Sequence, residues 1–544
     1  MGAFQDMIYF AIFLGVLVTV HEAGHFFAAK WAGVKVLQFA IGFGPKLFGF
    51  RRGETEYSIR ALPLGGFVAM AGHHPGEDVA EEDAGRTFLG AVWWKRVIIL
   101  LAGPAANLVF PIIALFFVYL GDSTEFTPRV GAVEPGSPAA VAGLRPGDLI
   151  VSIDGTPIRT FAELSKIAGA SADKELALVV DRAGKKEALR VTPSNVETLG
   201  MIEISRKGRI GISLAEQAAV LGVPSGSAVE AAGLRTFDRV IQLNDEPVRT
   251  ARELEVALDK ATGTVKLKVV RFSPLHDGLV LPELVDAEVP LSEGLGVARI
   301  GAEGGDAYVW EVRPNTPAAA LGIKVGDQFT AVSGQAVHSV GAVEDRMALS
   351  RKRRVDIEWR SSSGEKHAAS VGPFVPEGNA KYCMVATDFG VRFGAPGLPM
   401  APIAGDTVTL HFGPIEALQA SLKKLPEGIM LIGRIFAKLP TGEVPLESMG
   451  GPVQIFQVAS QTASAGLGAF LSAMAIVSVN LALVNLLPIP ILDGFGILTA
   501  LWEAIRRRPV PMRAREIATY FGFAVLALLM VVAFRNDIAR LLFC

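Results

Sequence analysis

The chain has 544 residues, of which 50% are hydrophobic, and its formal net charge at neutral pH is −2. This length allows several domains, and the mean hydropathy of +0.39 is high for a soluble protein. The nearly balanced charge, with no basic run interleaved with aromatic residues, excludes the usual signature of nucleic-acid binding. The two cysteines, Cys383 and Cys544, are far apart and lack metal-type spacing, which excludes a disulfide framework.

Four apolar segments approach the length of about 18 to 25 residues that crosses a bilayer as a helix. They predict transmembrane helices at 1–30, 97–120, 467–495 and 517–535. The first segment follows no basic residues and precedes no A-x-A cleavage site, so we expect it to be retained rather than removed as a signal peptide. The predicted fold class is therefore a multipass α-helical membrane protein with four transmembrane helices.

Positively charged residues predict the orientation of these segments. Lysines and arginines cluster in the loop 31–96 and again at 506–515, whereas the first six residues carry none and the tail after Phe534 carries two. Short loops rich in lysine and arginine stay in the cytosol. Both loops are therefore expected on the cytosolic side, and both termini and the region between the second and third segments are expected outside it.

The long region between the second and third segments contains a repeat. "EPGSPAAVAGLRPGDLIVSIDGTPI" at 134 recurs in related form at 223 and at 313, so that Asp148, Asp238 and Asp327 are 90 and 89 residues apart. This period suits a small independent domain rather than a solenoid unit. We predict three domains, at 127–197, 208–292 and 297–375, and then an extracytoplasmic linker at 376–466.

Each copy carries the signals of a short helix followed by a strand. A serine or threonine stands where a helix N-cap belongs, and a glycine suited to a left-handed helix end follows six residues later. These pairs are Ser137 and Gly143, Ser227 and Gly233, and Thr316 and Gly322. The pattern resembles PDZ domains of the bacterial, protease-associated kind, which are α+β domains that take a peptide or chain terminus along a strand edge. The alternative is that the copies act as spacers or exclude folded domains. The second copy matches least well, because Phe237 replaces the glycine of the turn.

The first apolar segment ends in the sequence "VHEAGHFFAAK". His21, Glu22 and His25 spell H-E-x-x-H, which on a helix places both imidazoles on one face for a metal ion, with the glutamate beside it as a general base. The alternative is a pair of interfacial histidines that reach towards the membrane surface beside Lys30. The intramembrane location favours a metal site, because ionisable residues in that position are functional candidates.

Catalytic zinc usually has three protein ligands and one open position. The other histidines lie in predicted soluble segments, and the pair His73 and His74 in a Gly/Pro/acid-rich loop is expected to be solvated. Asp493 is the only acid within or at the end of the third apolar segment. The first and third segments run in the same direction, so Asp493 is expected at the depth of both histidines. A turn aspartate without a metal is the alternative.

These motifs together resemble one family. H-E-x-x-H in the first segment, "GFGPKL" at 42, "TEYSIRALPLGGFVAM" at 55, "LAGPAANL" at 101 and "NLLPIPILDG" at 485 occur in the order seen in bacterial site-2 proteases. The chain is similar to the intramembrane zinc metalloproteases of the regulator-of-sigma-E type. The third PDZ-like copy departs from that pattern, because relatives usually carry one or two.

The resemblance implies a zinc endopeptidase of the bacterial cytoplasmic (inner) membrane, with its active site towards the cytosolic face. It implies Zn²⁺ held by His21, His25 and Asp493, with Glu22 as the catalytic base. Its substrates are expected to be single-span membrane proteins, such as anti-sigma factors or remnant signal peptides, after a first extracytoplasmic cut. The PDZ-like modules are expected to meet peptide termini or folded domains. No nucleic-acid partner is expected.

The resemblance also suggests how substrate is held. The region 31–96 is expected to contain a membrane-associated β-loop that offers an edge strand to the substrate, with Gly65 and Gly66 at its end. Asn480 and Asn485 are candidates to hold substrate carbonyls, and hydrogen bonding between helices is the alternative for both. A rival function is a non-catalytic membrane PDZ scaffold or receptor with a structural zinc. The amphipathic stretches between 416 and 439 fit either a membrane surface or a docking helix.

Overall fold

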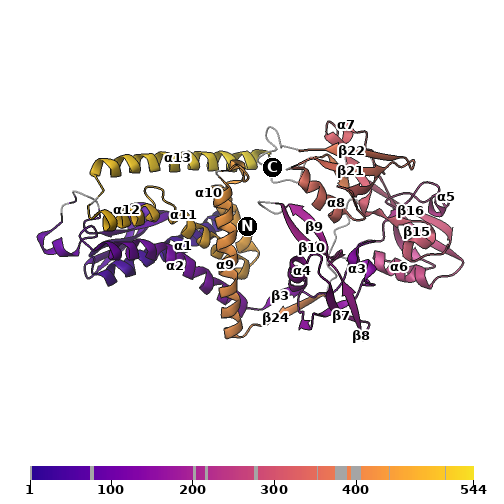
Figure 1. The fold of residues 1–544 in the computed structure, drawn as a ribbon, viewed down its shortest axis with the longest axis horizontal. Coiled ribbons are helices and arrows are strands. Elements are labelled where there is room, and N and C mark those ends of the chain that lie inside the picture. The colour runs from indigo at the N-terminus through magenta and orange to yellow at the C-terminus, as the bar shows by residue number, and fades with distance from the viewer. Residues whose placement is uncertain are drawn as a thin grey trace. The chain divides into compact units, whose positions relative to one another are not determined.

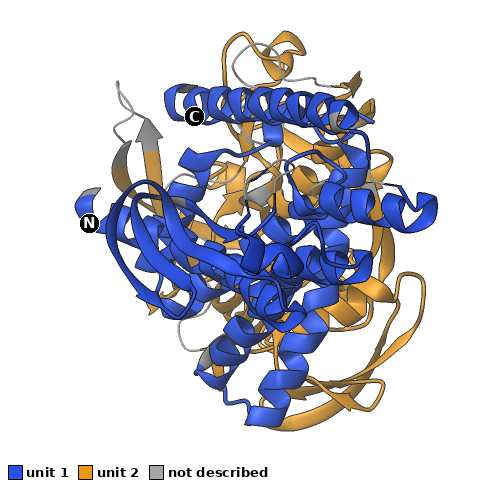
Figure 2. Cartoon of the chain, turned by 90° about the vertical axis from the view of Figure 1, so that its left-hand side faces the viewer, with its two compact units in different colours: residues 1–123, 410–544 blue, residues 124–409 orange. Residues whose placement is uncertain are grey.

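The computed structural model describes residues 3–73, 77, 79–199, 204–214, 218–274, 280–351, 353–373, 389–393, 406–439, 441–508 and 510–543. The chain forms two compact units. One combines Met1–Ser123 with Leu410–Cys544, and the other is Thr124–Thr409 (Figure 2). Within the predicted linker 376–466, residues 376–388, 394–405 and 440 lie outside the described residues.

The first unit consists of long helices and one β-hairpin. In chain order its elements are α1 (Ala3–Ala32), β1 (Val36–Arg52), β2 (Thr55–Met70), η1 (Glu81–Arg86), α2 (Trp93–Leu120), α9 (Pro414–Lys438), η7 (Leu446–Ser448), α10 (Pro452–Ser464), α11 (Leu467–Asn485), α12 (Asp493–Arg506) and α13 (Met512–Phe543) (Figure 1). By length and composition, α1, α2, α11 and α13 are able to cross a membrane.

Helix α1 is held closely by its neighbours. A Cβ atom at Gly24 would lie 2.2 Å from the carbonyl oxygen of Ala102 in α2, so glycine is needed for this approach. Nearer the N-terminus, Phe13 and Leu17 are fully buried, and the Phe13 ring meets the Phe470 ring of α11 edge to face at 5.4 Å. These contacts set the rotation of α1 and hence the direction of the side chains in its last turns.

The third apolar segment, predicted over 467–495, is divided into two helices by its prolines. Helix α11 ends at Asn485, and α12 begins at Asp493. Pro488 and Pro490 lie between the two helices, and proline interrupts a helix because it lacks an N–H group and clashes with the preceding turn. Asp493 is therefore the first residue of a new helix.

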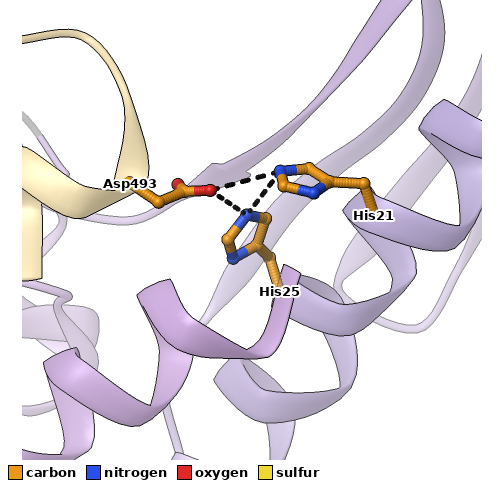
Figure 3. A group of neighbouring side chains, drawn as sticks. All are labelled: His21, His25 and Asp493. Carbon is orange, nitrogen blue, oxygen red and sulfur yellow. Dashed lines mark hydrogen bonds and ion pairs between the residues drawn. The ribbon is translucent and has the colours of Figure 1, made fainter. Parts of the chain in front are cut away.

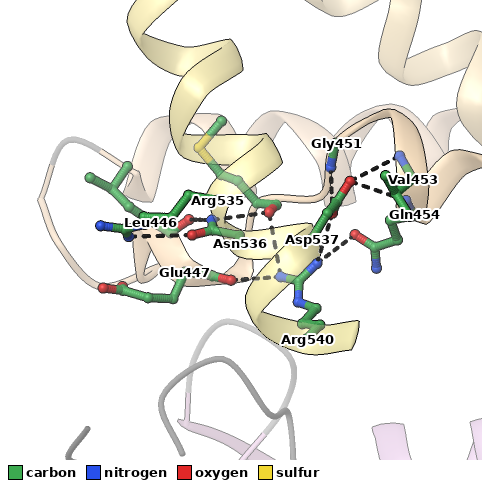
Figure 4. A network of polar contacts seen from close by, with 10 residues as sticks. Leu446, Glu447, Gly451, Val453, Gln454, Arg535, Asn536, Asp537 and Arg540 are labelled. Atoms are coloured by element: carbon green, nitrogen blue, oxygen red, sulfur yellow. Dashed lines mark hydrogen bonds and ion pairs between the residues drawn. The ribbon is translucent and has the colours of Figure 1, made fainter. Parts of the chain in front are cut away.

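Helix α13 is longer than the predicted segment 517–535 because its last turns have polar partners. Asp537 accepts hydrogen bonds from the backbone N–H groups of Gly451, Val453 and Gln454 at the start of α10 (Figure 4). Asn536 donates to the carbonyl oxygen of Leu446, 2.7 Å away. The helix therefore continues beyond the predicted end at residue 535.

The β-hairpin follows α1 directly. Its strands pair antiparallel from Arg52 and Thr55 at the turn to Val36 and Met70 at the base, with several shifts of register. One shift lies at Gly42, which has a φ of +88° and whose Cβ, if present, would lie 2.6 Å from a carbonyl oxygen of β2. The hairpin occupies the part of 31–96 in which the β-loop was predicted.

The second unit contains three copies of one sheet, each with the strand order 2-1-3-4 and one helix between its second and third strands. The first copy is β5 (Leu149–Ile153), β6 (Thr156–Pro157), α4 (Phe161–Ala170), β7 (Leu176–Arg182) and β8 (Lys185–Val191). The second is β13 (Arg239–Leu243), β14 (Glu246–Pro247), α6 (Ala251–Lys260), β15 (Thr264–Pro274) and β16 (Val280–Pro290). The third is β19 (Gln328–Val332), β20 (Gln335–Ala336), α8 (Val340–Met347), β21 (Val355–Arg360) and β22 (Lys366–Val371) (Figure 1).

The predicted caps are confirmed in all three copies. The side chains of Ser137, Ser227 and Thr316 each accept a hydrogen bond from the backbone N–H group three residues later. The glycines that follow have left-handed φ angles of +80°, +83° and +75°. Phe237, which replaces a glycine, also has a positive φ of +77°, and its ring meets Trp310 edge to face at 4.8 Å. An aromatic contact therefore accompanies the strained backbone.

The buried aspartate of each repeat accepts hydrogen bonds, but its partners in the first two repeats differ from those in the third. Asp148 and Asp238 each accept two hydrogen bonds from the guanidinium group of an arginine, Arg182 and Arg271 respectively. Asp327 instead accepts from the backbone N–H groups of residues 324 and 362. Among the residues that the structure describes, Asp327 therefore has no arginine partner like the one that the first two repeats share.

Charged side chains also join the first repeat to the third. Arg209 ends the hairpin formed by β9 (Ser194–Leu199) and β10 (Ile204–Arg209), and Ile210 after it packs in the core of the first repeat, although the second domain was predicted from residue 208. Arg209 donates to Asp345 at 2.5 Å, and Arg353 forms an ion pair with Glu197 of the same hairpin. Within the second unit, the third copy therefore has an interface of its own with the first.

Candidate metal centre

Two histidines of α1 face the same point. His21 and His25 lie one helical turn apart, and their Nε2 atoms are 3.2 Å from each other. Both side chains are buried, at 8% and 7% exposed, although imidazole is polar. Buried polar groups need partners, so the surroundings of these rings decide what the pair can do.

The third member of the group is Asp493, the first residue of α12. Its Oδ2 atom lies 3.2 Å from Nε2 of His21 and 3.4 Å from Nε2 of His25 (Figure 3). The structure thus brings together the three residues predicted as metal ligands, although 468 positions separate Asp493 from His25. Tetrahedral zinc with bonds of about 2.0 Å places its ligand atoms about 3.3 Å apart. The three separations therefore fit a zinc ion.

The second nitrogen of His25 supports the same interpretation. Its Nδ1 atom lies 2.7 Å from the carbonyl oxygen of Ile99 in α2. A carbonyl only accepts hydrogen bonds, so Nδ1 carries the proton and Nε2 keeps a lone pair for a metal. Gly103 makes room for the ring, because a Cβ atom there would lie 2.2 Å from Nε2. The donor set and its cradle therefore fit Zn²⁺.

A cavity of about 450 Å³ opens onto this group. Glu22, adjacent to His21 on α1, lines it, as do Gly65, Gly66 and Asn485. At Gly66 a Cβ atom would lie 3.1 Å from Cγ of Glu22 and 2.8 Å from a carbonyl oxygen of β1, so glycine lets β2 pass close to the glutamate. The wall beside Glu22 is consequently backbone.

The two candidate asparagines of α11 have different surroundings. The amide nitrogen of Asn485 lies 3.3 Å from Nε2 of His21. Asn480 is exposed and does not line the cavity. Of this pair, the structure brings only Asn485 to the metal group.

Sequence reasoning missed two residues of the site. Asn107 of α2 is fully buried, with its amide nitrogen 3.2 Å from Nδ1 of His21. His73 was expected to be solvated, but it lines the cavity and stacks on the Phe88 ring at 4.8 Å. His74 lies outside the described residues. The signal that the sequence offers for Asn107 is a polar amide within an apolar segment.

Ion pairs hold the elements around the site. Arg96 of α2 pairs with Glu503 of α12, and both side chains are mostly buried. Lys30, in the last turn of α1, and Arg86, at the end of η1, both form ion pairs with Glu54 of the hairpin turn. Arg86 first, and Lys30 second, lower the pKa of Glu54 from 4.5 to about 2. The helix that carries the histidines is thus tied to the hairpin that lines the cavity.

Comparisons with known proteins agree with this site. The family model for peptidase family M50 matches residues 9–529. The regulator of sigma-E protease RseP of Escherichia coli is 28% identical over 546 residues, covering 98% of this chain and 99% of that protein. Protease RseP of Yersinia pestis is 27% identical, covering 99% of this chain and all of that protein. A Neisseria meningitidis protein named as a zinc metalloprotease is 27% identical over 541 residues.

A PDZ domain of the SdrC-like protein of Listeria monocytogenes covers 18% of this chain at 23% identity and a TM-score of 0.14, which is too low to support an argument. The family match and the relatives confirm the predicted zinc metalloprotease, and they leave no support for the rival of a non-catalytic scaffold. The chain belongs to peptidase family M50, and it is a zinc-dependent membrane metalloprotease.

Proposed function

We propose that this protein is an intramembrane endopeptidase that cleaves the transmembrane segments of single-span membrane proteins. One observation carries the proposal: two histidines and one aspartate, from helices far apart in the sequence, converge within 3.4 Å beside a glutamate-lined cavity. The group lies among apolar helices long enough to cross a bilayer. Peptide bonds of a membrane-spanning substrate are therefore the bonds within its reach.

The roles of the side chains follow from their positions. His21, His25 and Asp493 would hold the zinc ion, which when bound polarises a scissile carbonyl and lowers the pKa of water. Glu22 accepts the proton of the attacking water and passes it to the departing amine, because its carboxylate stands beside the metal ligands on the cavity wall. The burial of the group keeps bulk water from competing with the substrate.

Substrate must be unwound before it can be cut, because a helix hides its peptide bonds in its own hydrogen bonds. An unwound segment in lipid needs new partners. Gly65 and Gly66 of β2 line the cavity with backbone, which supports an edge strand as the partner. Asn485 supports a role in holding a substrate carbonyl, since it lies beside His21. For Asn480, which is exposed, the same role is the weaker proposal.

The location and the natural substrates are part of the proposal. With four transmembrane helices and cytosolic basic loops, both termini and the PDZ domains lie on the extracytoplasmic side of a bacterial inner membrane. Relatives are named as regulators of sigma-E proteases, which supports membrane-bound anti-sigma factors as substrates after a first extracytoplasmic cut. Remnant signal peptides have the same single-span form. The PDZ domains would admit trimmed chain termini and exclude folded domains.

The test is cleavage of a tagged single-span substrate. The substrate is co-expressed with the wild-type protein, Glu22→Gln or Asp493→Asn in cells that lack the endogenous protease. Glu22→Gln is expected to lower the rate of cleavage about 10²- to 10⁴-fold, because the proton acceptor is lost. The tag reports the size of the product and hence whether the cut lies within the transmembrane segment.

The matched control is Glu82→Gln, which changes an exposed acid of η1 in the same way and should leave cleavage unchanged. Equal cleavage by the wild-type protein and both site variants would refute the proposed catalytic group. Cleavage only outside the transmembrane segment would refute the intramembrane reaction.

A further inference from the structure

The side-chain amide of Asn107 is buried, and among the described residues only one of its two ends has a polar neighbour. Asn107 lies on α2, its side chain is fully buried, and its amide nitrogen is 3.2 Å from Nδ1 of His21. Its carbonyl oxygen Oδ1 is also buried and has no hydrogen-bond partner within the described part of the chain. A buried carbonyl without a donor costs about 1 to 3 kcal/mol. The amide of Asn107 therefore has a neighbour for its nitrogen but none for its oxygen.

The chemistry of His21 decides which end of this amide should face the ring. If the nitrogen of Asn107 donates to Nδ1, then the proton of the neutral imidazole must be on Nε2. Nε2 is the atom that faces His25 and Asp493, so a proton there would block metal binding. The two ends of an amide have nearly the same shape and are assigned from their partners. With the amide turned over, Oδ1 gains a donor and Nε2 is free.

We propose that Asn107 is a positioning residue for the metal centre: its Oδ1 accepts the hydrogen bond from Nδ1–H of His21 and so directs Nε2 of that ring to the metal. The inference rests on the proposed metal site and adds to it a residue of a third helix, α2. The partner of His25 is the carbonyl of Ile99, 2.7 Å from its Nδ1. Helix α2 thus orients both histidines of α1.

The position of Asn107 is itself well fixed. Ser478 of α11 donates a hydrogen bond to the backbone carbonyl of Asn107, 2.8 Å away, and the Ser478 side chain is fully buried. Helices α2 and α11 are therefore bonded at the level of this amide. A partner of a metal ligand must be held firmly to keep the ring in one orientation.

The experiment measures zinc affinity in the full-length protein carrying Glu22→Gln, so that metal binding is separated from proteolysis. Asn107→Leu removes both ends of the amide and should weaken zinc binding about 10- to 100-fold in a chelator competition. Asn107→Asp keeps an acceptor in the same place but has no donor, and should stay within about threefold of the parent. Asn195→Leu makes the same change at an exposed amide of β9 in the second unit, and should leave the affinity unchanged.

The outcomes separate this inference from the proposed function. If His21→Ala does not weaken zinc binding, the metal site itself is wrong. If His21→Ala weakens binding but Asn107→Leu does not, only the role of Asn107 is overturned. Equal losses for Asn107→Asp and Asn107→Leu would also overturn it, because the amide nitrogen would then be the group that matters. Should the leucine variant fail to fold, Asn107→Ala takes its place in the same comparison.

Discussion

Two aspartates of the first unit, the buried Asp537 and the mostly buried Asp493, begin or stabilise a helix, but their surroundings differ. Asp537, 2% exposed, accepts three backbone hydrogen bonds from the start of α10 at 2.9 to 3.2 Å, and Arg540 lies beside it (Figure 4). A carboxylate at a helix N-terminus satisfies free N–H groups and the helix dipole together. Each of these four polar partners of Asp537 is thus a donor.

Asp493 faces two imidazole nitrogens instead of backbone N–H groups. Its nearest partners are the Nε2 atoms of two imidazoles, and at His25 the proton lies on the opposite nitrogen, facing Ile99. Lone pairs that converge on one point repel one another unless a cation lies between them. The comparison teaches that a buried acid satisfied by its own chain marks structure, whereas one that its chain leaves unsatisfied marks a binding site.

The strongest test of this comparison is Asp493→Ala. Loss of one of three ligands should reduce cleavage by roughly three orders of magnitude, as expected when a group that stabilises the transition state is removed. Zinc content after dialysis should fall with it. The metal-free variant should unfold at the same denaturant concentration as the metal-free wild-type protein, because Asp493 is not expected to stabilise the fold. A large loss of stability in the metal-free state would contradict that view.

The next test removes an ion-pair partner in the second unit. Arg182→Met leaves the carboxylate of Asp148, which is 1% exposed, without its two guanidinium hydrogen bonds. A buried charge left unpaired costs about 3 kcal/mol, so the free energy of unfolding of the first repeat should fall by that amount in denaturant titrations.

The third repeat supplies the matched control. By strand register, Ser361 stands where the first two repeats have their arginine, and Asp327 relies on backbone donors. Ser361→Ala should therefore change the free energy of unfolding by less than about 0.5 kcal/mol. A similar loss in both variants would mean that the guanidinium group is not what stabilises the buried acid.

Asp537→Ala should lower the free energy of unfolding less than the loss of Arg182 does. In contrast to Asp493→Ala, it should lower stability and leave zinc binding intact. Three N–H groups of α10 lose their acceptor, which should lower the free energy of unfolding by about 2 kcal/mol. Zinc affinity should be unchanged, because no ligand is touched. Thermal unfolding and chelator competition on one sample give both quantities. Loss of zinc without loss of stability would reverse the roles assigned to the two aspartates.

The sequence allowed one of these acids to be predicted and not the other. Asp493 was predictable because it is the lone acid of an apolar segment and the direction of that segment places it beside the histidines. Asp537 follows an arginine and an asparagine near the end of the chain, where charged residues are usually solvated. Its partners belong to a different helix, and their approach depends on tertiary packing that no local spacing encodes.

The same limit applies to the metal centre and the repeats. H-E-x-x-H was readable because helical periodicity places its members on one face. The role of Asn107 depends on the rotation of α2 against α1, which close packing at Gly24 sets. The caps of the repeats were local and predictable, but the pairing of Arg209 with Asp345 required the first and third repeats to meet.

The smallest expected effect concerns Glu54, an acid that is more exposed than Asp493 and Asp537. Arg86 and Lys30 hold its pKa at about 2 in the folded protein, against about 4.5 in the unfolded chain. A lowered pKa stabilises the folded state above pH 4.5, and this stabilisation is lost as the pH falls through 2. Because the group is partly exposed, we expect only about 1 kcal/mol at pH 7. The difference in unfolding free energy between wild type and Glu54→Gln should therefore shrink steadily from pH 6 to pH 3, whereas Glu82→Gln, at an exposed acid, should show no such trend. A difference that does not change with pH would mean that the negative charge of Glu54 does not stabilise the folded protein, and that glutamine at this position serves as well as glutamate.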